Sequence, residues 1–155
     1  MNKWDRRMLD LAHLVASWSK DPSTKVGAVI ADAQHRVVSL GFNGPPSRVP
    51  DGEMGRDKKL AITIHAEENA LLFAQQNLVD CTMYVTHPPC ARCASKIIQM
   101  GVLRVVAVKA PSEFESRWAD SIKMAEDLMR DAPTLFITVD NHESILRTDV
   151  GCDPV

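Results

Sequence analysis

The second half of the chain alternates apolar, strand-like runs with segments of helical spacing, and this alternation constrains the fold most strongly. Strand-like runs cover 82–86, 102–108 and 134–139, and the spacing predicts helices over 90–100 and 114–130 between them. Two parallel neighbouring strands need such a crossover connection, so we expect the last two strands to run parallel.

The first half adds a helix and a hairpin to this pattern. Apolar residues at helical spacing predict a helix over 4–18, and the runs 26–31 and 36–42 are typical of two hairpin-connected strands. The stretch 44–59 is rich in Gly, Pro and charge and is expected to be a long loop, before a helix over 64–76. The sequence therefore predicts an α/β fold, a three-layer α/β/α sandwich around a five-stranded, mostly parallel mixed sheet.

Composition narrows the class of protein. The 155 residues suit one compact domain, and 45% hydrophobic residues are enough for one core. A net charge of -2 argues against a dedicated nucleic-acid partner, because such domains carry a basic excess. No apolar run is long enough for a membrane span, and the first residues do not resemble a signal peptide, so we expect a cytoplasmic protein with no membrane partner.

Two short motifs carry metal-binding chemistry. His65-Ala66-Glu67 opens one predicted helix, and Pro89-Cys90-Ala91-Arg92-Cys93 opens the next. Thiolate and neutral imidazole are good zinc ligands, and a catalytic zinc uses three protein ligands and one water. The positive end of a helix dipole also favours thiolate. His65, Cys90 and Cys93 are therefore the predicted zinc ligands.

Glu67 is the predicted catalytic residue. It lies two residues after His65, within reach of a water held in the fourth position of the metal. Zinc lowers the pKa of such a water to about 7, and a neighbouring carboxylate can take its proton and pass it on.

Other interpretations of the cysteines remain open at this stage. Cys90 and Cys93 alone are compatible with a redox pair, or with half of a structural zinc site completed by Cys81 or Cys152. A structural site has no need of Glu67, so the full pattern favours catalysis. His87, beside the cysteine motif, is the other histidine that a pocket role would suit.

The arrangement H-x-E followed by P-C-x-x-C is the known signature of zinc deaminases. Over about residues 19–139 the chain resembles the deoxycytidylate (dCMP) deaminase family of the cytidine-deaminase-like superfamily. The segments that carry the resemblance are Ser19–Ala28 (SKDPSTKVGA), Gly41–Pro45 (GFNGP), His65–Ala70 (HAEENA), Met83–Thr86 (MYVT) and Pro89–Ala94 (PCARCA).

The resemblance implies that the chain converts dCMP to dUMP and ammonia, supplying thymidylate synthesis. It implies that Asn43 binds the sugar hydroxyl and that the Ala66 N–H binds the cytosine carbonyl. Lys25, with Ser23 and Thr24, is the candidate phosphate site.

The resemblance also bears on the cofactor, the partners and the domain limits. It suggests a homo-oligomer, a hexamer or a dimer, with dCTP and dTTP as possible allosteric effectors. Because 44–64 contains no cysteine for a second zinc, we expect one Zn²⁺ per subunit. The deaminase domain is expected over 1–140, with a C-terminal tail over 141–155.

Two departures from the family pattern leave alternatives open. Glu68 stands where the family usually has an apolar residue, and Phe114 is the nearest match to a tyrosine that commonly follows the fourth strand. The alternative substrates are modified dCMP, dCTP or a free nucleoside. A tRNA adenosine deaminase and a non-catalytic nucleotide-binding zinc module are the more distant alternatives.

Overall fold

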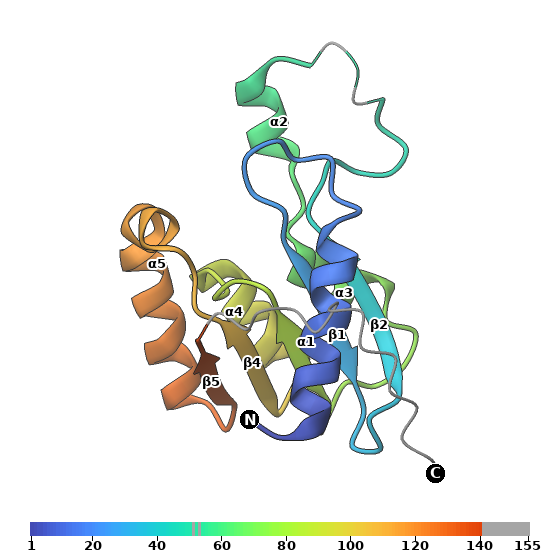
Figure 1. Cartoon of the computed structure of the whole chain (residues 1–155), viewed down its shortest axis with the longest axis vertical. Helices are drawn as coiled ribbons and strands as arrows, with labels where there is room; N and C mark the ends of the chain where they lie inside the picture. Colours follow the sequence, from blue (N-terminus) through green and yellow to red (C-terminus); the bar gives the residue numbers. More distant parts are fainter. Residues whose placement is uncertain (51, 53, 141–155) are drawn as a thin grey trace, which may run out of the picture.

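The computed structural model describes residues 1–50, 52 and 54–140, except for the side chain of Glu115. This part of the chain contains five helices and five strands, whose arrangement can be followed in Figure 1. In chain order they are α1 Lys3–Ala16, β1 Gly27–Ala31, β2 Val37–Phe42, α2 Arg56–Ile62, α3 Ala66–Phe73, β3 Thr82–Val85, α4 Ala91–Gln99, β4 Arg104–Val108, α5 Ser112–Asp131 and β5 Leu135–Val139. The predicted tail, 141–155, lies outside the described residues.

The five strands form one mixed sheet in the order β2-β1-β3-β4-β5. β1 pairs antiparallel with both of its neighbours, whereas the β3–β4 and β4–β5 pairs are parallel. Four strands therefore run in one direction and β1 runs against them. This confirms the mostly parallel mixed sheet, including the predicted parallel pairing of the last two strands.

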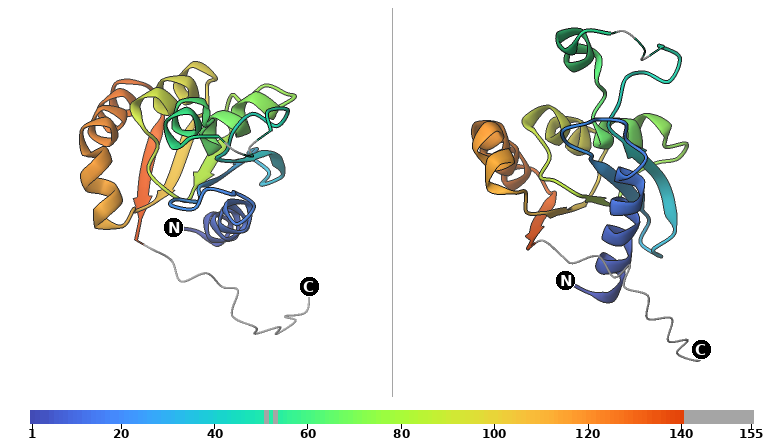
Figure 2. Two further views of the ribbon diagram at one scale, coloured as in Figure 1. Left: turned by 90° about the horizontal axis from the view of Figure 1, so that it is seen from above. Right: turned by 45° about the horizontal axis from the view of Figure 1, so that its top comes forward.

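Helices cover both faces of the sheet, which confirms the predicted three-layer sandwich (Figure 2). On one face, α1 packs on the sheet through Met8, Leu9, Ala12 and Val15. On the other face, α3, α4 and α5 pack side by side through small and aliphatic residues. These are Ala66, Ala70 and Leu71 of α3, Cys93, Ala94 and Ile97 of α4, and Ala125 and Met129 of α5. The two helices with the predicted metal ligands are therefore neighbours over the same face.

The prediction of an uninterrupted loop over 44–59 is wrong, because α2 begins at Arg56. The Gly44 and Ile64 backbones pair with each other and close the base of this excursion, while α2 stands away from the sheet (Figure 1). No residue of α2 is buried. A helix without a buried face leaves no apolar periodicity in the sequence, which is why the pattern did not reveal it.

No helix among the described residues is both long enough and apolar enough to span a membrane.

Gly41 sets how closely α3 approaches β2. A Cβ atom on Gly41 would lie 2.4 Å from the Ala66 carbonyl oxygen and 2.4 Å from the Ala70 nitrogen. Since both atoms belong to the helix backbone, no rotamer change can relieve such a clash. Gly41 therefore holds the N-terminal half of α3 against the sheet.

Gly41→Ala is expected to lower the free energy of unfolding by about 1–3 kcal/mol, because overpacking at this contact must displace α3. Urea unfolding measures the change. Gly55→Ala is the control, since nothing lies within 4 Å of a Cβ atom there. A Gly41→Ala protein as stable as the Gly55→Ala protein would contradict this account of the helix position.

A buried ion pair fixes the start of α1 beneath the sheet. The Arg104 guanidinium donates to both carboxylate oxygens of Asp5, at 2.6 and 2.9 Å, and the Tyr84 hydroxyl donates to Asp5 at 3.2 Å. Asp5 is 1% exposed and also completes a capping box with Asn2. Burial opposes ionisation of Asp5, but the hydrogen bonds from Arg104 and Asn2 hold its pKa below the ordinary value.

Asp5→Asn is expected to cost about 3 kcal/mol at pH 7, because Arg104 loses its charged partner. The pKa of Asp5 is lower in the folded chain than in the unfolded chain, so its contribution is fully present above pH 4 and is lost as the pH falls through the folded pKa. Urea unfolding of both proteins from pH 7 to pH 3 should therefore show a stability difference that shrinks below about pH 4. A difference independent of pH would contradict the ionised pair.

Candidate metal centre and active site

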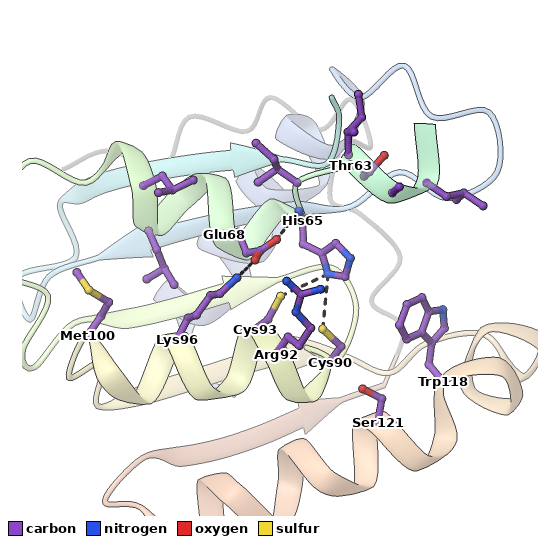
Figure 3. A pocket seen from close by; sticks show the side chains of 16 residues that line it. Thr63, His65, Glu68, Cys90, Arg92, Cys93, Lys96, Met100, Trp118 and Ser121 are labelled. Atoms are coloured by element: carbon purple, nitrogen blue, oxygen red, sulfur yellow. Dashed lines mark hydrogen bonds and ion pairs between the residues drawn. The ribbon is translucent and has the colours of Figure 1, made fainter. Parts of the chain in front are cut away.

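The three predicted ligands meet where two helices begin (Figure 3). His65 is the N-cap residue of α3, Cys90 is the N-cap residue of α4, and Cys93 lies in the first turn of α4. The His65 Nδ1 atom lies 3.6 Å from the Cys90 sulfur and 3.4 Å from the Cys93 sulfur. The structure thus brings together residues that are 25 and 28 positions apart in the sequence.

These spacings fit a tetrahedral metal ion. With Zn–S and Zn–N bonds of about 2.3 and 2.1 Å, tetrahedral angles place nitrogen and sulfur ligands about 3.6 Å apart. All three ligand atoms lie within 4.8 Å of one another, and among the described residues no other group of three or more His, Cys, Asp or Glu side chains has this property. The donor set of one imidazole and two thiols suits zinc.

The structure weighs against the other interpretations of the cysteines. Cys90 and Cys93 are both free thiols, not a disulfide. Cys81 is buried just before β3 and does not belong to the ligand group. Cys152 lies outside the described residues. The described ligand group therefore has three members, which is the number that a catalytic zinc site uses.

Hydrogen bonding within the group prepares it for a cation. Bonds with Cys93 and His65 lower the pKa of the Cys90 thiol to about 4, despite its burial. Cys93 has a raised pKa because it shares its proton with the Cys90 sulfur and is buried. These hydrogen bonds therefore favour the thiolate form of Cys90.

Glu67 is buried beside the ligands. It is the second residue of α3, is 4% exposed, and interacts with the Cys93 thiol. Burial raises the pKa of its carboxyl group. A carboxyl group whose environment favours the protonated form is suited to accepting and returning a proton during catalysis.

A cavity of about 670 Å³ adjoins the predicted ligands and is lined by residues of α3, α4, α5 and the segment 60–64. His65, Cys90 and Cys93 line it, together with Arg92 and Lys96 of α4 and Trp118 of α5 (Figure 3). Lys96 and Trp118 could not be predicted as site residues, because their place beside the predicted ligands depends on how the helices pack.

α5 also supports the metal site directly. Its Ser121 hydroxyl accepts a hydrogen bond from the Ala91 N–H at 3.1 Å, so it satisfies an N–H group in the first turn of α4. Cys90 precedes this residue, and Ser121 thereby fixes the backbone that carries the ligand.

An aromatic row crosses from His65 to His87 along the N-terminal half of α5. Trp118 meets the His65 ring edge to face at 6.2 Å, Phe114 stacks on Trp118 at 6.1 Å, and His87 contacts Phe114 at 4.8 Å. Burial and the nearby charge of His13 lower the pKa of His87 to about 4, so its ring is neutral at pH 7. Aromatic pairs at these distances attract one another, so the row helps to hold these side chains beside the predicted ligands.

Asn43 occupies a structural position after β2. Its Oδ1 atom accepts from the Val26 N–H at 2.8 Å, and its Nδ2 group donates to the Thr24 carbonyl at 2.9 Å. The Ser19 hydroxyl donates to the Asn43 carbonyl, at 2.8 Å. Asn43 therefore ties the loop between α1 and β1 to the end of β2, which its sequence context did not reveal.

The same loop carries the candidate phosphate-binding residues. The Asp21 carboxylate accepts from the backbone N–H groups of Ser23 and Thr24, both at 2.8 Å, and Ser23 and Lys25 are exposed. None of the predicted substrate residues Ser23, Thr24, Lys25, Asn43 and Ala66 lines the cavity described above. Ala66 is fully buried as the first residue of α3.

Comparisons with known proteins agree with this site. A family model described as the cytidine and deoxycytidylate deaminase zinc-binding region matches residues 2–109. A deaminase from the luxG 3′ region of Aliivibrio fischeri is 47% identical over 134 residues, which are 85% of this chain and 90% of the relative. The deoxycytidylate deaminase of Homo sapiens is 36% identical over 115 residues, which are 67% of this chain.

The match spans 64% of the human protein's length. Among solved structures, the dCMP deaminase of the cyanophage S-TIM5 in complex with dCMP and dUMP superimposes with a TM-score of 0.74. It is 23% identical, and the superposition covers 90% of this chain and 99% of that one, so the two share their fold.

Because the family model covers most of the chain and includes His65, Glu67, Cys90 and Cys93, the chain belongs to the cytidine and deoxycytidylate deaminase family and is a hydrolytic deaminase.

Proposed function

We propose that this protein deaminates dCMP to dUMP and ammonia, with one zinc ion per subunit held by His65, Cys90 and Cys93. The observation that carries the proposal is the tetrahedral spacing of these ligands with the buried Glu67 carboxyl group beside them. A bound zinc ion would supply a water of lowered pKa as the nucleophile.

Glu67 is the proton carrier in this reaction. It takes a proton from the attacking water and delivers it to the ring nitrogen N3 as the oxygen adds to C4 of cytosine. It then transfers the second proton of the water to the exocyclic amine. The C4–N bond breaks, ammonia leaves, and the ring becomes uracil.

The substrate residues remain those that the sequence suggested. The Ala66 N–H lies in the first turn of α3, where N–H groups lack partners within the helix, and would bind the cytosine carbonyl. Asn43 retains one Nδ2 hydrogen and one Oδ1 lone pair for the sugar hydroxyl after its two backbone bonds. Ser23, Thr24 and Lys25, on the loop that Asn43 fixes, would bind the phosphate.

Several wider expectations from the sequence belong to the same proposal. They are a supply of dUMP for thymidylate synthesis in the cytoplasm, a homo-oligomer, and regulation by dCTP and dTTP. The named human and cyanophage relatives, a deoxycytidylate deaminase and a dCMP deaminase, support the choice of dCMP as substrate.

Glu67→Gln is expected to lower kcat by about 10²–10⁴-fold, because an amide cannot carry the proton. Zinc content should stay at about one ion per chain, since three protein ligands are unchanged. Ammonia release from dCMP and elemental analysis of the same samples test both points. Turnover at the wild-type rate in this variant would contradict the mechanism.

Phosphate recognition predicts a preference for dCMP over deoxycytidine. Lys25→Gln should lower kcat/KM for dCMP by about tenfold, because one charged hydrogen bond to the phosphate is lost. Turnover of deoxycytidine, which has no phosphate, should be unchanged. Steady-state assays with dCMP, deoxycytidine, dCTP and 5-substituted dCMP measure the preference. Equal kcat/KM values for dCMP and deoxycytidine would overturn the phosphate site.

A further inference from the structure

Glu68 interacts with both helices that carry the metal ligands. As the third residue of α3, it accepts a hydrogen bond from the His65 backbone N–H at 3.1 Å and so completes a capping box. Its other carboxylate oxygen forms an ion pair with Lys96 of α4 (Figure 3). Lys96 lies one turn beyond Cys93, on the same side of that helix.

The Glu68–Lys96 ion pair is a polar link between the two helices that carry the predicted metal ligands. Among the described residues, the polar contacts between α3 with its cap and α4 with its cap are those among His65, Cys90 and Cys93, the contact of Glu67 with Cys93, and the Glu68–Lys96 pair. The remaining contacts are apolar, through Ala66, Ala70 and Leu71 facing Cys93, Ala94 and Ile97. Apolar contacts are non-directional, whereas an ion pair between two fixed side chains favours one relative position of the two helices.

We propose that Glu68 and Lys96 are positioning residues for the metal centre, which hold the imidazole of α3 and the two thiols of α4 at metal-binding distance. The inference rests on the proposed zinc site. Capping fixes the backbone of His65, and the ion pair fixes α3 relative to α4. Partners of this kind outside the ligand shell typically change metal affinity by about 10–100-fold.

The position of Glu68 also explains why a charged residue is tolerated beside the ligands. Its side chain is 16% exposed, and Lys96 is 45% exposed. The pair is electrically neutral, so it adds little net charge to a site that must balance two thiolates against a divalent cation. Removing one partner therefore changes both geometry and charge, and the two effects can be separated experimentally.

The decisive variants are Lys96→Met and Glu68→Gln. A charge effect alone gives opposite signs: loss of Lys96 leaves an unpaired anion that favours Zn²⁺, while loss of the Glu68 charge leaves an unpaired cation that disfavours it. Loss of positioning weakens binding in both. We expect both variants to bind zinc about tenfold more weakly than wild type, and Lys96→Arg to restore the affinity.

The control is a second ion pair of similar design far from the ligands. In the β1–β2 turn, Asp32 accepts backbone N–H bonds from Gln34 and Arg36 and pairs with the Arg36 side chain at 2.7 Å. Its side chain is 15% exposed, close to that of Glu68. Arg36→Met should lose a comparable ion pair but keep the zinc affinity of the wild type.

Competition with a chromophoric zinc chelator measures the affinity of each protein, and circular dichroism of the metal-free forms confirms that they are folded. Tight binding in Lys96→Met, equal to or above wild type, would overturn the positioning role while leaving the zinc site intact. An equal loss of zinc affinity in Arg36→Met would also overturn the positioning role, because it would show that removing any ion pair of this kind weakens zinc binding. Failure of the wild type to bind zinc would refute the proposed metal centre and this inference together.

Discussion

The convergence of two helix N-termini on one face of the sheet is the arrangement on which the site depends. Each helix start has N–H groups without partners and a positive dipole end, and both favour anionic groups. The chain places His65, Glu67, Cys90 and Cys93 there, three of them the proposed metal ligands and one a buried carboxyl group. The preference of helix N-termini for anionic groups thus favours both the thiolate form of the cysteines and the presence of a carboxyl group beside them.

The rest of the fold holds these two helix N-termini in place relative to each other. Gly41 allows α3 to lie directly on β2, and the parallel pairing of β3 with β4 gives α4 its crossover position next to α3. On the opposite face, the pair of Asp5 and Arg104 fixes α1 against the sheet. Ser121 reaches from α5 to the first turn of α4. The predicted ligands themselves lie on short segments, and their geometry depends on contacts with the sheet and with α5.

Sequence reasoning recovered the parts of the molecule that leave a local pattern. The strands and the longer helices showed apolar periodicity. Residue chemistry and spacing selected His65, Cys90 and Cys93, which the structure brings together. Gly101 follows Met100, the C-cap of α4, with a left-handed φ of 74°, the conformation for which glycine is favoured after a helix. The helix α2 was missed because it buries nothing, so its residues carry no periodic signal.

The contacts that support the site could not be predicted from the sequence. The pairing of Glu68 with Lys96, the hydrogen bond of Ser121 and the stacking of Trp118 all depend on how α3, α4 and α5 pack, which no short segment encodes. Asn43 was predicted to bind the substrate, and the oxygen and nitrogen of its side-chain amide also hold the loop between α1 and β1. A family resemblance can point to such a residue without indicating which backbone groups form hydrogen bonds with its side chain.

The central claim, a catalytic zinc with three protein ligands, is tested most directly by X-ray absorption spectroscopy at the zinc edge of the purified protein. We predict two sulfur ligands at about 2.3 Å and two nitrogen or oxygen ligands at about 2.0–2.1 Å, one of them the His65 imidazole and the other an exchangeable water. A shell of four protein ligands, with three or four sulfurs and no exchangeable position, would contradict it.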